Sequence, residues 1–380
     1  MPNVQYKYLS VAPGRVNLLG EHVDYNGGSV LPVAINLNAH LEFSPRKDKQ
    51  VHIEAPDLHG KVVFDLNQLE QKADLAGNPL PRWAQYPAGV AWSLMQSGLT
   101  LIGLDGRFTS TVPIGSGLSS SAAMEVAFAS AWNVLAGVKL DNTQIALLSQ
   151  KAENQYVGVN CGIMDQFASA NGIADHAIVL NTRTLDFHPV PLPANTVIVI
   201  ADSGVRRSLV NSEYNVRRAG CEMALSILAT QIPGIQYLRD VSSQQLNQYY
   251  SLLPDPVNGY ARHIIEECER VDQGVAMLEN KDAAGFGDLM FKCHASLRDL
   301  YRVSAPELDI LVEIASKQPG CLGARLTGAG FGGCTVNLVE TDAASFFIEE
   351  IKTGYLKATG KVAKVYRCTA SAGVSVTPLN

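Results

Sequence analysis

The sequence predicts an α+β fold of two domains, each with a mixed or antiparallel sheet covered by helices. The chain has 380 residues, more than one hydrophobic core usually accommodates. Strand-like alternation dominates residues 37–66, whereas residues 255–318 read mainly as amphipathic helix. The proline-rich run 189–193 separates the two patterns. We therefore predict one domain over residues 1–188 and a second over residues 189–380.

Bulk composition narrows the classes of function. The net charge is −6 and no run of Lys and Arg occurs, so we expect no nucleic-acid partner. No stretch approaches about 18 consecutive apolar residues, and Met1–Lys7 contain no signal-peptide core, so we expect a cytoplasmic protein without a membrane segment. The seven cysteines never show C-x-x-C spacing and the eight histidines show no zinc-ligand spacing. We therefore expect neither disulfides nor a transition-metal site. The sequence leaves open whether the protein binds a hard ion such as Mg²⁺.

The N-terminal elements are a strand and a polar loop. Residues 6–12 alternate as a strand, which Pro13 and Gly14 should end. The next segment concentrates four ionisable side chains between glycines and apolar flanks: Arg15, Glu21, His22 and Asp24. Such groups either face solvent or form a binding surface, and the apolar flanks favour a binding surface. Carboxylates and an imidazole together can hydrogen-bond several hydroxyls, so a sugar is a plausible ligand.

A glycine- and serine-rich loop over residues 113–121 is the strongest site signal in the chain. It follows a strand at 107–112 and opens a helix at 122–135. Glycines allow close approach to an anion, and the first-turn amides and helix dipole favour phosphate. The ordinary alternative is a serine N-cap on a core helix. The loop lacks the lysine of a Walker A motif and contains no G-x-S-x-G, so phosphate charge must be met by a metal ion, the dipole and cations from elsewhere.

Two carboxylates follow on short helices. Glu153 lies in the last turns of a helix predicted over residues 143–157, where a surface carboxylate is the ordinary interpretation. Asp165 lies in the first turn of a helix over residues 163–170, among apolar neighbours that would exclude water. The helix dipole would keep Asp165 ionised; a simple capping aspartate is the alternative.

The second half contains strands, helices and another glycine-rich loop. Strands are predicted at 177–180 and 196–202, and a helix from residue 212. Gly328–Cys334 formally match G-x-G-x-x-G, but residues 335–339 form a strand pattern and not the helix that a pyrophosphate site requires. We therefore predict a tight joint between two strands that comes close to another backbone or a ligand.

Several separated segments resemble one family. Residues 14–28, G-R-V-N-L-L-G-E-H-V-D-Y-N-G-G, closely resemble the galactokinase signature. Residues 113–123 are similar to the phosphate-binding motif of the GHMP small-molecule kinases, and residues 328–334 to the third motif of that superfamily. Two more segments, 152–166 and 212–215, also resemble galactokinases. The match spans nearly the whole chain.

The resemblance implies a two-domain GHMP-kinase fold with the active site in the cleft between the domains. It implies ATP-dependent phosphorylation of the C1 hydroxyl of galactose, which gives galactose 1-phosphate and ADP. ATP would be the co-substrate, Mg²⁺ the metal ion, and we expect a monomer. The signature departs from the family where Leu19 and Val23 replace the usual Ile and Thr, at flanking positions.

The resemblance also assigns roles to matching residues. Asp165 would be the catalytic base, and Arg15 would keep it ionised and stabilise the charge that develops in transfer. The sugar would be held by Glu21, His22, Asp24, Gly162, Asp165 and Tyr214. The ATP phosphates would be bound by Gly115, Ser116, Gly117, Leu118, Ser119, Ser120 and Ser121. Mg²⁺ would be bound by Ser121 and Glu153.

Alternatives remain beside this assignment. A kinase for a related sugar, such as N-acetylgalactosamine or arabinose, would use the same machinery, because specificity can depend on one small pocket. A galactose sensor that regulates transcription without catalysis is expected to have a disrupted phosphate loop, whereas residues 117–123 are intact. Reading the glycine loops as plain turns would leave several coincident segments unexplained.

Overall fold

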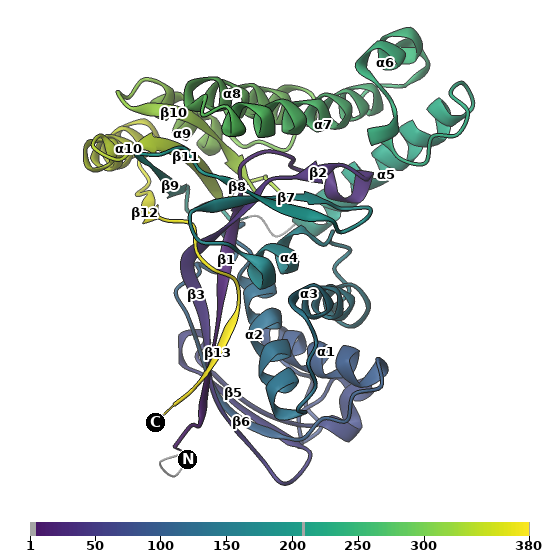
Figure 1. Ribbon diagram of the computed structural model, residues 1–380, viewed down its shortest axis with the longest axis vertical. Helices are drawn as coiled ribbons and strands as arrows, with labels where there is room; N and C mark the ends of the chain where they lie inside the picture. Colours follow the sequence, from purple (N-terminus) through teal and green to yellow (C-terminus); the bar gives the residue numbers. More distant parts are fainter. Residues whose placement is uncertain (1–4, 207–209, 380) are drawn as a thin grey trace.

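The α+β class is confirmed by the computed structural model, which describes residues 5–206 and 210–379. Within these residues the strands form a six-stranded, a four-stranded and a three-stranded sheet. Figure 1 shows the six-stranded sheet and its helices at one end of the molecule, and the four-stranded sheet with its helices at the other. The chain crosses between the two ends more than once, because its last strand returns to the first sheet.

The first sheet is mixed, with the order β13-β1-β3-β6-β4-β5. Its pairs are antiparallel except β4 with β6, which is parallel. Its strands are β1 (Tyr8–Asn17), β3 (Pro32–Pro45), β4 (Gln50–Ala55), β5 (Gly60–Asp65), β6 (Leu104–Ser110) and β13 (Ser375–Pro378). The helices of this half are α1 (Arg82–Gln96), α2 (Ser120–Leu135), α3 (Asn142–Lys151) and α4 (Met164–Asn171). Helix α2 packs on β1 and β3 and contacts the other three helices, so it is the centre of this half.

Strand β1 corrects one expectation from the sequence. Pro13 and Gly14 do not end the strand; it continues to Asn17, with a register shift between Pro13 and Arg15 in its pairing with β3. The glycine is required by a close approach, because a Cβ at Gly14 would lie 2.8 Å from the carbonyl oxygen of Leu118. Arg15 therefore belongs to a strand beside the phosphate loop and not to a free loop.

The proline-rich run is also different from the expectation. It forms strand β8 (Phe187–Pro191), which pairs with β7 (His176–Asn181) next to β2 (Ser29–Val30). Proline is tolerated there because β8 is an edge strand of this three-stranded sheet. The predicted boundary between residues 188 and 189 falls within β8, and the division into domains stays a prediction.

The second half is built on an antiparallel sheet of order β10-β11-β9-β12. Its strands are β9 (Thr196–Asp202), β10 (Cys321–Thr327), β11 (Cys334–Glu340) and β12 (Lys364–Cys368). Its helices are α5 (Val210–Ala229), α6 (Ser243–Tyr249), α7 (Val257–Glu279), α8 (Ala283–Asp299), α9 (Pro306–Ser316) and α10 (Ala344–Thr359). The third glycine-rich segment joins β10 to β11, so the predicted joint between two strands is confirmed.

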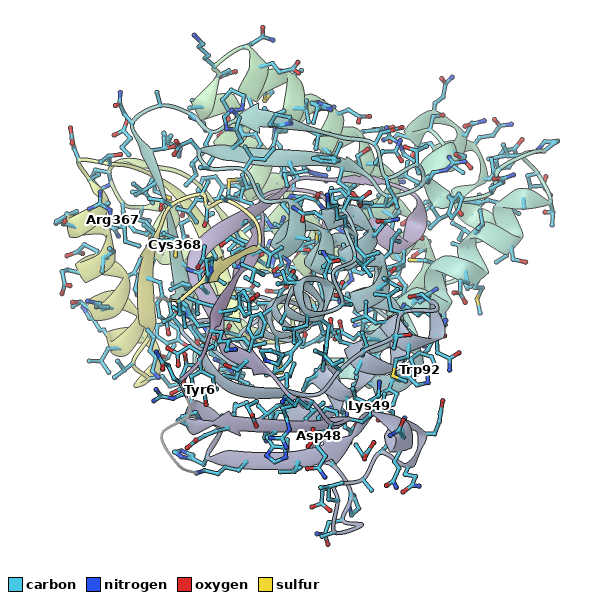
Figure 2. The ribbon with its side chains drawn as sticks, turned by 60° about the horizontal axis from the view of Figure 1, so that its bottom comes forward. Tyr6, Asp48, Lys49, Trp92, Arg367 and Cys368 are labelled. Carbon is cyan, nitrogen blue, oxygen red and sulfur yellow. The ribbon has the colours of Figure 1, made fainter. Side chains whose placement is uncertain are left out.

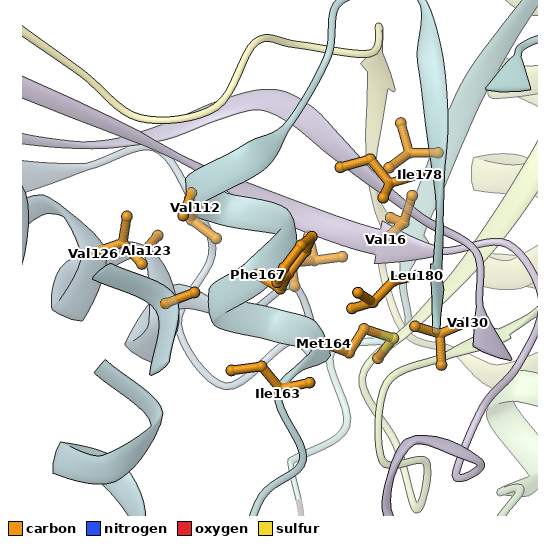
Figure 3. Packing of buried hydrophobic residues seen from close by; sticks show 14 of the residues in the cluster. Val16, Val30, Val112, Ala123, Val126, Ile163, Met164, Phe167, Ile178 and Leu180 are labelled. Atoms are coloured by element: carbon orange, nitrogen blue, oxygen red, sulfur yellow. The ribbon is translucent and has the colours of Figure 1, made fainter. Parts of the chain in front are cut away.

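One continuous core extends from α2 to the second half. Figure 3 shows its central part, where Phe167 of α4 lies between α2 and the strands that carry Val16 and Leu180. Phe167 is fully buried, which contributes roughly 2 kcal/mol of hydrophobic stabilisation. Asp48 and Lys49 are polar residues of the turn between β3 and β4 (Figure 2). This turn lies at the end of the molecule far from α7 and α8 (Figure 1). No helix in the two described ranges is both long and apolar enough to cross a membrane.

Candidate active site

The loop before α2 folds as a phosphate cradle requires. Gly115 and Gly117 have positive φ angles of 65° and 81°, so the chain turns back on itself before the helix begins. Ser119 immediately precedes α2, but its hydroxyl makes no capping hydrogen bond to the helix. It donates instead to Oδ2 of Asp165, at 2.6 Å. The serine-cap alternative is therefore wrong at Ser119, and the first-turn amides of α2 remain suited to an anion.

The predicted loop residues divide into two sets. Five line a cavity of about 400 Å³, which we call the phosphate cavity: Gly115, Gly117, Ser119, Ser120 and Ser121. The side chains of Ser116 and Leu118 are fully buried, and Ser116 Oγ donates to the carbonyl of Pro113 at 2.7 Å. Neither residue is among those that line the phosphate cavity.

Arg15 and Asp165 form an ion pair at the centre of the site. Arg15 Nη2 lies 2.6 Å from Asp165 Oδ1, and Arg15 Nε donates to the same oxygen at 2.8 Å. Arg15 Nη1 donates to the Gly117 carbonyl at 2.7 Å, so one guanidinium fixes both the carboxylate and the phosphate loop. Arg15 is only 4% exposed, and its charge is weakly screened by water.

Helix α4 places Asp165 in its first turn, as the sequence predicted. Ile163, Met164 and Phe167 around it are buried and anchor the helix in the core (Figure 3). The positive end of the helix dipole favours the carboxylate at this position. The Asp165 side chain is 28% exposed, so it can reach a ligand in the cavity.

A second cavity of about 180 Å³, which we call the sugar cavity, adjoins this ion pair. It brings together all of the predicted sugar-binding residues: Glu21, His22, Asp24, Gly162, Asp165 and Tyr214. A Cβ on Gly162 would overlap the Asp24 carboxylate, so only glycine fits there. The cavity thus joins the signature segment with α4 and α5.

Burial dominates the electrostatics of the sugar cavity. Burial, together with the nearby Asp165 and Glu21 carboxylates, raises the pKa of Asp24 to about 7. Burial lowers the pKa of His22 to about 4 and outweighs Glu21 and the Ala329 carbonyl, which act in the opposite direction. The imidazole is therefore neutral near pH 7, with one nitrogen as donor and the other as acceptor.

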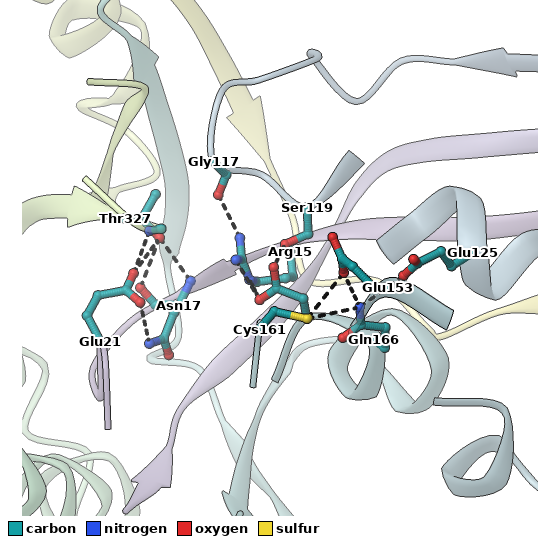
Figure 4. Close-up of polar contacts among 12 residues, drawn as sticks. Arg15, Asn17, Glu21, Gly117, Ser119, Glu125, Glu153, Cys161, Gln166 and Thr327 are labelled. Carbon is teal, nitrogen blue, oxygen red and sulfur yellow. Dashed lines mark hydrogen bonds and ion pairs between the residues drawn. The ribbon is translucent and has the colours of Figure 1, made fainter. Parts of the chain in front are cut away.

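Glu21 reaches further than the sequence suggested. Its Oε1 lies 2.7 Å from Arg325 Nη2 and accepts the Gly328 amide at 2.6 Å and the Thr327 hydroxyl at 3.3 Å. Asn17 Nδ2 donates to Oε2 at 3.2 Å. Glu21 lines the sugar cavity, but it also ties the signature segment to the third glycine-rich loop (Figure 4). No spacing in the sequence indicates the pair with Arg325, because the two residues lie some three hundred positions apart.

Glu153 lies in a π-helical turn, Ala152–Val157, which continues α3. Such turns often mark functional positions because they displace one residue from the regular helix. Gln166 Nε2 donates to Glu153 Oε2 at 2.6 Å and to the fully buried Glu125 at 2.9 Å. Burial and the nearby Asp165 raise the pKa of Glu153. The surface alternative for Glu153 is wrong, since the residue is 6% exposed.

The two cavities share a wall. Arg15, Glu153 and Asp165 line both of them. Gly328 and Ala329 of the third glycine-rich loop also line both. A cation or carboxylate at this wall can therefore act on a group in either cavity.

A third, more apolar cavity of about 400 Å³ adjoins the phosphate cavity through Arg82, Tyr86, Gly115, Ser120 and Ser121. Its apolar lining includes Leu58, Trp83, Phe108, Ile114 and Met124. The sequence did not predict this cavity, because its walls come from segments without a common motif.

Arg206, like Arg325, is a residue of the site that the sequence did not indicate. It lines the phosphate cavity from the second half of the chain. Asp202 holds it through two hydrogen bonds, from Nη1 at 2.8 Å and from Nη2 at 2.6 Å. The only sequence signal was an arginine four residues beyond an aspartate at the end of a strand, which is too common to predict a site.

Comparison with family models agrees with this geometry. Residues 3–45 match the model described as the galactokinase galactose-binding signature. Residues 85–172 match the model for the N-terminal domain of GHMP kinases, and residues 275–356 the model for their C-terminal domain. The first match contains Arg15 to Asp24, and the second contains the phosphate loop, Glu153 and Asp165.

Individual proteins extend the likeness over the whole chain. A galactokinase from Roseiflexus sp. (strain RS-1) is 47% identical over 363 residues, which cover 96% of this chain and 91% of that protein. A galactokinase from Chloroflexus aurantiacus is 45% identical over 97% of this chain and 93% of its own length. The crystal structure of Lactococcus lactis galactokinase complexed with galactose superposes with a TM-score of 0.92 at 34% identity, covering 98% of this chain and 95% of that one.

Proposed function

Because this chain belongs to the galactokinase family, we propose that its joined cavities transfer the γ-phosphoryl group of ATP to the C1 hydroxyl of galactose. Galactose would occupy the sugar cavity and the triphosphate the phosphate cavity. The products are galactose 1-phosphate and ADP. The residue roles below are part of this proposal.

One observation carries the proposal: Asp165 and Arg15 lie at the wall that both cavities share. Phosphoryl transfer needs an acceptor hydroxyl and a donor phosphate held in line, and it needs little covalent chemistry from the protein. A carboxylate and a guanidinium in contact at 2.6 Å offer a proton acceptor and a fixed positive charge at that junction. This combination fits transfer between the two cavities better than binding in either one alone.

Asp165 accepts the proton of the C1 hydroxyl as the new bond between that oxygen and the γ-phosphorus forms. The bond from the γ-phosphorus to the oxygen bridging it to the β-phosphate breaks, and ADP leaves. Arg15 holds Asp165 Oδ1 with two donors, and Ser119 donates to Oδ2, so Oδ2 is the oxygen that keeps a lone pair for the sugar. A general base that is positioned in this way typically contributes about 10²- to 10⁴-fold to the rate.

Arg15 and Arg206 supply the positive charge that a loop without lysine lacks. The Gly117 carbonyl orients Arg15, and Asp202 orients Arg206. Both guanidinium groups are therefore held in place before a ligand binds. Fixed charges aimed at the transferring group stabilise the transition state without reorganisation. The main-chain amides at the start of α2 complete the cradle.

The residues present fit a magnesium ion bound together with ATP. No group of three or more His, Cys, Asp or Glu side chains among the described residues could hold a metal ion alone. Mg²⁺ characteristically uses one or two protein oxygens together with phosphate oxygens, and Glu153 and Ser121 both line the phosphate cavity. When bound, the ion neutralises phosphate charge. Burial first, and then the nearby Asp165, raise the pKa of Glu153, and a divalent cation beside it would favour its charged form.

The third cavity suits the adenine ring. Its lining is mostly apolar and includes the aromatic side chains Trp83 and Phe108, which can pack against a flat purine. It adjoins the phosphate cavity at Gly115 and Ser120, as a base linked to a triphosphate requires.

A coupled assay of ADP release tests the proposal across galactose, N-acetylgalactosamine, arabinose, glucose and mevalonate. We expect the highest kcat/KM with galactose and no turnover without Mg²⁺. A higher kcat/KM for N-acetylgalactosamine or arabinose would make the chain a kinase for that sugar. Galactose binding without ADP release, with either ATP or Mg-ATP present, would support a sensor instead.

A further inference from the structure

His22 lines the sugar cavity, and its two ring nitrogens differ in their hydrogen bonds. The residue is 5% exposed and lines the sugar cavity. Its Nε2 forms no hydrogen bond within the described part of the chain. Its Nδ1 lies 2.9 Å from the Tyr25 hydroxyl. Because an unpaired buried nitrogen is unfavourable, a ligand hydroxyl in the cavity would satisfy Nε2.

A chain of hydroxyls extends behind Nδ1. The Tyr25 hydroxyl lies 2.7 Å from the Tyr301 hydroxyl, which lies 3.3 Å from Sγ of Cys221. Tyr301 is fully buried, and neither tyrosine lines the sugar cavity. Their hydroxyls are therefore linked to the cavity through the His22 ring, while the Tyr25 ring also contacts Tyr214, a residue of the cavity wall, with ring centroids 5.3 Å apart.

The rings of the same cluster fix the orientation of the imidazole. The Tyr301 ring centroid lies 4.8 Å from that of His22, and the Tyr214 centroid lies 5.5 Å away. The backbone of His22 is left-handed, with φ 64°, which turns the side chain toward the cavity. A 180° flip of the ring would remove Nδ1 from the Tyr25 hydroxyl and leave that bond unmade.

The tautomer matters because the ring is neutral. Burial lowers its pKa to about 4, so near pH 7 the proton resides on Nδ1 or on Nε2. The direction in which the tyrosine hydroxyls donate decides this position. With Tyr25 donating to Nδ1, Nε2 carries the proton and donates to a sugar hydroxyl; with the reverse order, Nε2 accepts.

We propose that Tyr25 and Tyr301 are positioning residues that hold the His22 ring and fix the role of its Nε2 toward one hydroxyl of the sugar. The inference rests on the proposed function, since it assumes that galactose occupies the sugar cavity. It assigns part of the sugar specificity to two side chains that do not touch the sugar.

Tyr301→Phe tests the proposal because it keeps the ring and removes only the hydroxyl. We expect KM for galactose to rise about five- to tenfold, the loss expected for one hydrogen bond, while kcat stays within about twofold and KM for ATP is unchanged. The same variant is assayed with 2-, 3-, 4- and 6-deoxygalactose. His22→Asn serves as the reference, because Asn tolerates a left-handed backbone and its amide stops short of the Nε2 position.

The deoxy series separates positioning from stability. For each deoxy sugar, the penalty is the rise in its KM relative to galactose in the same protein. In His22→Asn we expect this penalty to disappear for one deoxy sugar. In Tyr301→Phe we expect most of the penalty to disappear for the same sugar. Nitrogen-15 shifts of the His22 ring should show one tautomer in the wild-type protein and a mixture in Tyr301→Phe. The inference would be overturned if Tyr301→Phe showed the same KM penalty as the wild-type protein for every deoxy sugar and differed only in a lower melting temperature.

Tyr260→Phe is the matched control. Its ring lies 5.3 Å from that of Tyr301 and is buried, but its hydroxyl makes no hydrogen bond in the described residues. This variant should keep the wild-type KM and penalties; if it matches Tyr301→Phe, removal of any buried hydroxyl in the cluster explains the effect and the inference fails. If the wild-type protein itself does not phosphorylate galactose, the proposed function fails first, and the ring-nitrogen shifts still test the hydroxyl chain.

Discussion

Asp165 is the residue on which the proposed chemistry depends most directly. Its oxygens are held by Arg15 and Ser119, its helix is anchored by Phe167, and both cavities open onto it. A partly exposed carboxylate with this much support is expected to act by position, since each partner limits its motion.

Asp165→Asn keeps the shape of the side chain and removes the proton acceptor. We expect kcat to fall roughly 10²- to 10⁴-fold, while the Kd for galactose changes by less than about threefold. Steady-state ADP release and calorimetric titration with galactose measure the two effects. Asp175→Asn is the control, because Asp175 is exposed and distant from both cavities. Unchanged turnover in Asp165→Asn would remove the residue from the mechanism.

Asp24 links binding to stability through its raised pKa. Burial raises that pKa to about 7, above the ordinary value of 3.8. Between these two values the folded state binds a proton that the unfolded state has released, so this group costs stability as the pH rises through the window. An ionised Asp24 accepts sugar hydroxyls best, and the cost is therefore tied to function.

Asp24→Asn should separate the two effects. At pH 8 we expect the variant to be more stable than the wild-type protein by about 1 kcal/mol, a figure reduced for partial exposure, and the gain should shrink as the pH falls toward 4. Wild-type affinity for galactose should fall below pH 7, whereas the variant should bind weakly at every pH. Thermal unfolding and titration between pH 5 and 8 test this; a wild-type affinity independent of pH would contradict it.

At the scale of elements, the site depends on two glycine-rich loops in contact. A Cβ on Gly328 would lie 2.9 Å from the Gly117 carbonyl, and one on Gly333 would lie 2.7 Å from the Ser116 carbonyl. The second loop is therefore glycine-rich because another main chain occupies the space of its side chains. Its resemblance to a dinucleotide motif is a by-product of this packing.

Gly328→Ala should push the third loop away from the phosphate loop. We expect kcat/KM for ATP to fall at least about tenfold, because the added Cβ meets main chain that cannot yield cheaply. Gly137→Ala is the control: both glycines have a positive φ, but nothing lies within 4 Å of a Cβ at Gly137. In both variants the alanine is strained by the positive φ angle, but only Gly328→Ala should lose activity. Equal losses would show that strain alone matters.

At the scale of the whole molecule, the last strand joins the two ends of the protein. Strand β13 pairs with β1, and just before it Gly373 and Val374 donate to the carbonyls of Gly172, at 2.7 Å, and Ser169, at 3.0 Å. Ser169 belongs to α4, the helix that carries Asp165. The C-terminal segment thus supports α4, the helix that carries Asp165.

A chain truncated after Thr369 should lose this support. We expect the melting temperature to fall by several degrees and kcat to decrease, since the β13–β1 pairing and the backbone hydrogen bonds of Ser371, Gly373, Val374 and Leu379 are removed. Calorimetry and kinetics measure both. A chain that ends at Pro378 keeps the whole β13–β1 ladder and is the control. An unchanged melting temperature in the shorter chain would show that β13 contributes little.

Local sequence determined the elements and much of the site. Periodicity predicted β1, β3, β4, β5 and β6 of the first sheet, but not β13, and it predicted α2 and α4. Turn residues predicted the loops around them, because these signals act between neighbours in the chain. Arg15, Asp24, Gly162 and Asp165 could be named because each lies in a short motif of distinctive residues.

Tertiary structure decided what those motifs touch. The continuation of β1 past Gly14, the edge strand built from the prolines, the pair of Glu21 with Arg325 and the place of Arg206 all depend on contacts between distant segments. The hydroxyls behind His22 belong to the same class. A sequence pattern records what a residue needs from its near neighbours, whereas these contacts form only when the chain brings remote segments within hydrogen-bond distance.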